Sequence, residues 1–292
     1  MELWFIVATC GAITSGVSNF FFKVAAKNNC NAELFMFYSA VTSVVVATVL
    51  LLVSQQQLLG YGLAAVVLLG SGFISAASGS MKVYALRYID STIYFPLFKL
   101  LTPALAIFAG ITLFSESFTA IEWIGLIIGL LVPLMLITPG ENARQQNLVM
   151  GLAFVVVTSI LSALTAVAGK YAIDIDVPVF STLLLTVIGL AAGSVGLMIH
   201  KRGVGGLSSL IRLESSPLLI KTAVTRAVLI SFGVWAMLFA FSQGGTLSVV
   251  QTIHSMYILI PIVLAIIFYN EHWNLQKAAA IGLSIVSLAF LG

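Results

Sequence analysis

The sequence predicts an all-α integral membrane protein, with ten transmembrane helices arranged as two inverted-topology five-helix repeats around a central cavity. Three observations lead to this fold class. The composition is strongly apolar, the chain divides into apolar runs of membrane-spanning length, and its two halves are weakly similar to each other.

The composition indicates a surface that faces hydrocarbon. Of the 292 residues, 60% are hydrophobic and 8% are charged, and the mean hydropathy is +1.13. Soluble domains carry roughly 25% charged residues, so this chain cannot cover itself with a charged surface. Because the formal net charge is only +3 and Lys and Arg form no block, we expect no nucleic-acid partner.

Ten apolar runs have the length of membrane spans. A helix needs about 20 largely apolar residues to cross a hydrocarbon core about 30 Å thick. The runs are continuously apolar, without the alternation of a barrel strand, so they predict helices. No basic residues precede the first run, which favours a retained span over a secretory signal. The expected spans are residues 3–25, 33–53, 61–82, 92–114, 120–138, 148–170, 178–199, 219–242, 246–269 and 274–291.

An internal repeat relates the two halves of the chain. Shifts of 155 or 147 residues superpose Ala85 on Ala240, Ser91 on Thr246, Glu116 on Glu271, Ser15 on Ser162 and Lys23 on Lys170. We therefore expect one integral membrane domain made of two repeats, residues 1–140 and 147–292, with five spans each. Because five is odd, the second repeat must cross the membrane in the opposite sense, as in many secondary transporters.

The ten-helix pattern and several short motifs resemble a known family. The motifs are Ser15-Gly16-Val17-Ser18-Asn19-Phe20 ahead of Lys23, Ala85-Leu86-Arg87-Tyr88-Ile89, Pro103, and Ser115-Glu116 before a Gly-rich helix. Over essentially its whole length, the chain resembles the drug/metabolite transporter superfamily and, within it, the EamA-type ten-helix transporters. The resemblance implies a central cavity and alternating access. The second repeat departs from the pattern, with Ile258 at the position matching Pro103 and Pro261 one turn later, which leaves open whether both halves bend alike.

Cations inside the predicted spans indicate a binding site. Burying an ionised side chain at the bilayer centre costs at least about 2.5–3.5 kcal/mol, so Lys99 should face the protein interior or water. Its repeat mate is His254. Such a pair, with no buried acid beside it, favours a phosphate or carboxylate ligand. The alternative is that Lys99 reaches the interface and His254 only bonds a neighbouring helix. The predicted substrate-binding residues are Lys99, His254, Arg226, Gln251, Tyr257, Asn19, Thr102 and Trp235.

Other cations are expected outside the binding site. Lys82 and Arg87 end the third predicted span, and Lys23 and Lys170 end the first and sixth, so we expect them at an interface or vestibule. Glycines spaced four residues apart are expected to let helices approach closely. They are Gly125 and Gly129 in the fifth span and Gly189 and Gly193 in the seventh.

The sequence predicts a transporter rather than an enzyme. The three histidines are scattered and no acidic or histidine cluster has metal-ligand spacing, so we expect no catalytic centre and no cofactor. The leading hypothesis is a secondary transporter that moves a small polar metabolite with an anionic group. The alternative is a flippase for a lipid-linked phosphate, or a non-transporting membrane partner in envelope synthesis. Solute or lipid-linked phosphate and membrane lipid are the expected partners, and a homodimer is left open.

The charge distribution predicts an orientation in a cell membrane, which we expect to be a bacterial inner membrane. Cytoplasmic loops carry an excess of Lys and Arg. Loops after odd-numbered spans hold Lys27, Arg87, Arg144, Lys201, Arg202, Arg212, Lys221 and Lys277, whereas loops after even-numbered spans hold only Lys170. This imbalance predicts that both termini lie outside the cytoplasm, although the resembled superfamily implies the opposite.

Overall fold

The computed structural model describes residues 3–56, 62–89, 91–136, 148–203, 216–260, 264 and 275–291, and these residues form helices joined by short turns, without a strand. The helices are α1 (Leu3–Lys27), α2 (Ala32–Ser54), α3 (Gly62–Tyr88), α4 (Ser91–Phe114), α5 (Ala120–Met135), α6 (Leu148–Asp174), α7 (Val179–Arg202), α9 (Pro217–Ser242), α10 (Leu247–Met256) and α12 (Leu275–Leu291). The prediction of an all-α protein is thus confirmed for the described part of the chain.

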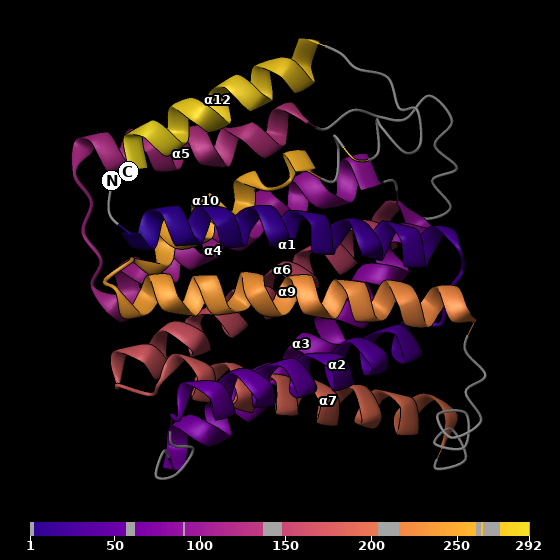
Figure 1. Ribbon diagram of the computed structural model, residues 1–292. Coiled ribbons are helices and arrows are strands. Elements are labelled where there is room, and N and C mark those ends of the chain that lie inside the picture. Colours follow the sequence, from indigo (N-terminus) through magenta and orange to yellow (C-terminus); the bar gives the residue numbers. More distant parts are fainter. Residues whose placement is uncertain are drawn as a thin grey trace.

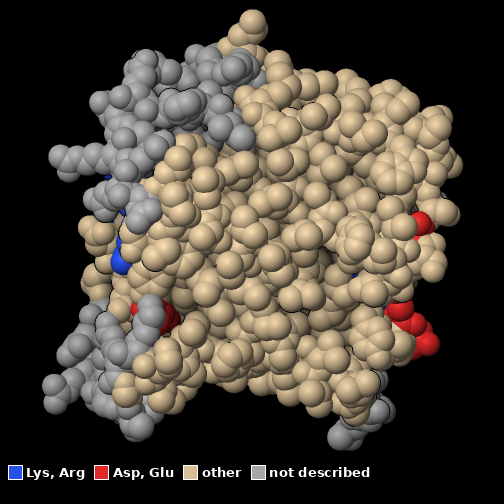
Figure 2. Space-filling model, turned by 180° about the vertical axis from the view of Figure 1, so that it is seen from behind, with Lys and Arg blue, Asp and Glu red and all other residues tan. Residues whose placement is uncertain are grey.

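Seven of these helices are long and apolar enough to cross a membrane: α1, α2, α3, α4, α6, α7 and α9. Large apolar side chains such as Leu52, Val53 and Val149 are more than 70% exposed, which a soluble surface would not favour. Figure 2 shows a surface whose middle is nearly free of charged side chains, with acidic side chains at the right edge and a few basic and acidic ones at the left. The chain is therefore a multi-pass membrane protein.

The helices form one bundle whose two chain ends lie together (Figure 1). The first residues of α1 and the last residues of α12 are at the same end of the bundle. Helix α1 packs against α9, α3 packs against α6 and α7, and α2 packs against α7 and α9. On the other side, α4 packs against α6 and α10, and α5 packs against α12.

Helices α3 and α7 approach each other through glycines. A Cβ atom at Gly189 would lie 2.1 Å from the backbone oxygen of Leu69, and one at Gly72 would lie 1.9 Å from the backbone oxygen of Thr186. Neither position has room for a side chain. The expected role of the small residues in close helix packing is therefore confirmed at this crossing.

Local sequence signals define where several helices begin. The Asn31 side chain accepts a hydrogen bond from Leu34 N at 2.9 Å, and Thr119 forms a reciprocal capping box with Glu122. The side chain of Thr246 accepts from Val249 N at the start of α10. These caps satisfy backbone N–H groups that have no partner within their own helix.

Helix α10 is shorter than the predicted span 246–269. It ends at Met256, and Tyr257 and Ile258 form a turn in which Ile258 N donates to Ser255 O at 3.2 Å. The sequence explains the break, because Pro261 has no N–H to donate to the carbonyl of Tyr257 four residues earlier. In contrast, α4 continues past its two prolines to Phe114. The two halves therefore differ here. Residues 261–263 and 265–269 of the ninth predicted span, and Glu271, lie outside the described residues.

Candidate functional site

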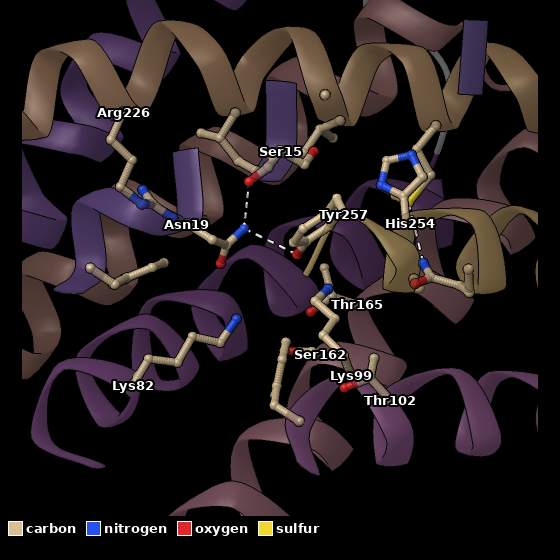
Figure 3. A pocket seen from close by; sticks show the side chains of 18 residues that line it. Ser15, Asn19, Lys82, Lys99, Thr102, Ser162, Thr165, Arg226, His254 and Tyr257 are labelled. Atoms are coloured by element: carbon tan, nitrogen blue, oxygen red, sulfur yellow. Dashed lines mark hydrogen bonds between the residues drawn. The ribbon is translucent and has the colours of Figure 1, made fainter. Parts of the chain in front are cut away.

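A polar cavity of about 160 Å³ lies between α1, α3, α4, α6, α9 and α10. We call it the polar chamber, and Figure 3 shows its lining side chains. Three basic side chains reach it from different helices: Lys82 from α3, Lys99 from α4 and Arg226 from α9. No Asp or Glu is among the described residues that line it. The arrangement therefore presents positive charge without a carboxylate to balance it.

Aromatic rings, rather than acids, contact the three cations. Lys99 Nζ lies 3.9 Å from the ring centroid of Tyr257, and Lys82 Nζ lies 4.2 Å from that of Phe98. The Arg226 guanidinium carbon lies 4.3 Å from the centroid of the Phe22 ring. A cation–π contact contributes about 0.5–2 kcal/mol, whereas burying an ion costs several kcal/mol, so these rings offset only part of the burial cost.

The Arg226 guanidinium is held in place through one nitrogen and leaves another without a partner among the described residues. Its side chain is 7% exposed, and Nη1 donates to the hydroxyl oxygen of Ser39 at 3.0 Å, while that hydroxyl donates to Ala223 O. Arg226 Nε finds no acceptor among the described residues. A buried donor left without a partner costs about 1–3 kcal/mol, so Arg226 Nε is a donor available to a bound anion.

A hydrogen-bonded pair positions the ring beneath Lys99. Asn19 Nδ2 donates to Ser15 O at 2.7 Å and to the Tyr257 hydroxyl at 3.0 Å (Figure 3). Tyr257 is the first residue of the turn that follows α10, so this contact joins α1 to the break in the helix. His254 Nε2 and Thr102 Oγ1, which also line the polar chamber, have no partner among the described residues.

A second chamber of about 210 Å³ adjoins the polar chamber. The two share lining residues, among them Lys82 and Arg226, which therefore lie at the junction. Helices α2 and α7 complete the second chamber. The residues that line only this chamber are the apolar Met36, Leu183, Val187 and Leu190, five Ser or Thr residues, and Gly79.

Many lining residues are separated by the offsets at which the two halves of the sequence were compared. Pairs separated by 147 residues on α1 and α6 or on α2 and α7, and by 155 residues on α3 and α9 or on α4 and the α10 segment, both line a chamber. These pairs are Ser15 and Ser162, Asn19 and Ala166, Met36 and Leu183, Ser43 and Leu190, Ser75 and Ile230, Ser78 and Gly233, Gly79 and Val234, Lys82 and Met237, Lys99 and His254, and Thr102 and Tyr257. The positive charge of Lys82 is not repeated, because its partner at this offset is Met237.

The structure brings together seven of the eight predicted binding residues. The polar chamber is lined by Lys99, His254, Arg226, Gln251, Tyr257, Asn19 and Thr102. Trp235 is the exception, because it lines neither chamber. The chamber-facing residues of α9 recur at helical spacing, and Trp235 points about 100° away from Val234. Its ring instead lies 5.2 Å from that of Phe232 and 5.6 Å from that of Phe239.

Sequence reasoning misplaced Lys82, which was expected at a vestibule. Helix α3 continues to Tyr88, so Lys82 lies well inside the helix instead of at its end. Its spacing from Ser75 and Ser78 places all three on one helical face, and all three line the second chamber. That spacing was the available signal. Lys170 meets the expectation of a span end, where it pairs with Asp174 at 2.6 Å.

An acidic side chain links the end of α4 to the start of α10. Glu116 accepts hydrogen bonds from Leu247 N and from the backbone N–H and hydroxyl of Ser248, the backbone bond to Ser248 measuring 3.2 Å. Gly110 makes room for it, because a Cβ there would lie 2.2 Å from Glu116 Oε2. The negative charge also interacts favourably with the N-terminus of a helix.

Comparisons with known proteins show the fold and no more. No protein-family model matches the chain, and no curated protein matches it. The chain is similar to a solved structure described as "Crystal structure of protein", with a TM-score of 0.70 and 15% sequence identity, over 97% of this chain and 95% of that one. Among the described residues, no group of three or more His, Cys, Asp and Glu side chains could hold a metal ion.

Proposed function

We propose that this protein is a secondary transporter for a small organic anion. The observation that carries the proposal is the cluster of Lys82, Lys99 and Arg226 around a central cavity whose described lining contains no acid. A phosphate or carboxylate between them would supply the missing negative charge and accept the free hydrogen of Arg226 Nε. Positive charge inside membrane-spanning segments commonly marks a substrate or ion pathway.

We further propose that the chain consists of two inverted five-helix repeats that move around this cavity. The helix contacts support the repeat, since α1 against α9 corresponds to α6 against α3, and α1 against α10 corresponds to α6 against α4. The paired lining residues support it independently. Transporters of this kind bind substrate at the repeat interface near the membrane midplane. Membership of the EamA-type transporters, ten spans, and termini outside the cytoplasm belong to the same proposal.

The proposal is tested by a thermal-shift screen of the purified protein, followed by transport assays in proteoliposomes. Inorganic phosphate, phosphorylated metabolites and organic acids should raise the melting temperature, whereas amino acids should not. A ligand at 100 times its Kd stabilises the folded state by about 2.7 kcal/mol. Stabilisation by lipid-linked phosphates alone would instead favour the flippase.

Two matched variants connect the screen to the site. Lys99→Met retains length and apolar contact but removes the charge, so anion stabilisation and anion transport should be lost while the protein still folds. Lys221→Met makes the same change at an exposed position on α9 and should behave like the unchanged protein. Equal anion affinity in the two variants would remove Lys99 from the binding site.

A further inference from the structure

The two chambers are best considered as one continuous binding site. They share Phe22, Lys82, Arg226 and Met237 among their lining residues, and their volumes of about 160 and 210 Å³ are comparable. A compact anion held by the cations would occupy only the first. The second chamber is therefore available to another part of the same ligand.

The chemistry of the two chambers differs. The polar chamber holds Lys99, His254 and Asn19 in addition to the shared cations. The second chamber adds aliphatic side chains from α2 and α7, including Met36, Leu183 and Leu190. No further Lys or Arg contributes to it among the described residues. An uncharged, largely apolar group suits such a lining, because removing apolar surface from water is favourable.

Five side-chain hydroxyl groups line only the second chamber, but they offer few free hydrogen-bonding groups to a ligand. Several are already bonded within the protein: Ser75 Oγ lies 3.0 Å from Thr165 Oγ1, and Thr186 Oγ1 donates to Thr182 O at 2.8 Å. Ser231 Oγ, by contrast, has no partner among the described residues. The lining could thus serve one hydroxyl on an otherwise apolar group more readily than a fully polar sugar.

We infer that the ligand is an amphipathic organic anion, whose anionic group binds at Lys82, Lys99 and Arg226 and whose apolar part occupies the second chamber. This inference rests on the proposed anion transport. Lys82 and Arg226 lie at the junction of the two chambers, and Lys99 lies in the polar chamber. The anionic group therefore binds on that side, and the ligand has a single orientation in the site. Its apolar part points toward α2 and α7, which pack against each other (Figure 1).

The test compares anions that share a head group and differ only in their apolar part. Methyl, butyl and phenyl phosphate form one series, and lactate and phenyllactate form another. Affinity for the purified full-length protein is measured by calorimetry. Burial contributes about 0.8 kcal/mol per methylene, a factor of about four, so butyl phosphate should bind at least about tenfold more tightly than methyl phosphate.

Variants of Leu190 show whether the second chamber produces this preference. Leu190→Trp should remove most of the gain for butyl and phenyl phosphate while leaving the affinity for methyl phosphate nearly unchanged. Leu190→Ala should shift the preference towards longer chains. Ile188→Trp, on the same helix and 38% exposed to the outside, is the matched control and should retain the wild-type preference.

The outcomes separate the two proposals. Anions that bind in a Lys99-dependent way without any gain from the apolar part would overturn the amphipathic ligand and leave anion transport standing. A gain that persists unchanged in both Leu190 variants would place the apolar part elsewhere and also overturn the inference. If no phosphate or carboxylate binds at all, both proposals are wrong.

Discussion

The carboxylate of Glu116 is hydrogen-bonded to both the backbone N–H and the hydroxyl of Ser248, residues that are 132 positions apart in the sequence. It attaches the segment after α4 to the first turn of α10, one turn before Gln251 enters the polar chamber. In the proposed transporter this contact joins the two repeats at the end of the bundle where the termini lie. Opening that end would require it to break.

Glu116→Gln should weaken this link. The substitution removes the negative charge near the helix N-terminus and at least one charge-assisted hydrogen bond, each of which contributes about 1.5–3 kcal/mol. We expect a lower melting temperature in detergent and faster hydrogen exchange at the start of α10. Glu122→Gln is the control, because glutamine also completes a capping box and its effect should be small. Identical melting temperatures for the two variants would show that the Glu116 contact is unimportant.

Substitution of Gly189 should separate α3 from α7. Gly189→Ala places a Cβ about 2.1 Å from the backbone oxygen of Leu69, an atom that cannot move aside without moving its helix. Overpacking of this kind typically costs about 1–3 kcal/mol. Gly70→Ala is the matched control, since nothing lies within 4 Å of a Cβ at that position. Thermal unfolding of both variants measures the difference. A Gly189→Ala variant as stable as Gly70→Ala would contradict the close packing at this crossing.

Carboxylate affinity should depend on His254. Its Nε2 has no partner among the described residues and its side chain lines the polar chamber, so it is available to a bound ligand. His254→Leu removes both ring nitrogens and should weaken carboxylate binding by about 0.5–1.5 kcal/mol, the contribution of one hydrogen bond. His200→Leu, at an exposed position near the end of α7, should bind like the unchanged protein. Calorimetry on both variants measures the difference, and equal affinities would place His254 outside the binding site.

The orientation can be measured with reporter fusions at Gly292. The excess of Lys and Arg in loops after odd-numbered spans predicts that a reporter active only outside the cytoplasm gives signal at this position. A reporter active only in the cytoplasm should be silent there. The reverse pattern would invert the orientation and leave the helical fold unaffected.

Helical class and most of the candidate site were accessible from the sequence because both depend on local features. An ionisable residue in an apolar run, such as Lys99, is informative wherever the run packs. The second chamber was not accessible, since an aliphatic residue such as Leu190 has the same appearance whether it faces lipid or a cavity. Lys82 was misplaced because the end of an apolar run is a poor guide to the end of its helix. The contact of Glu116 with Ser248 joins distant segments and carries no local pattern.

Within the described part of the chain no acid lies beside Lys82, Lys99 and Arg226, and this has an electrical consequence for the proposed transporter. Any of these charges that is displaced across the membrane potential does work of about 2.3 kcal/mol per elementary charge for each 100 mV. An unloaded cavity would carry its positive charge uncompensated, whereas an anion would cancel part of it. Voltage should therefore act differently on the empty and the loaded protein, and rearrangement without cargo should be the slower of the two. Such a protein would exchange one anion for another more readily than it would return empty.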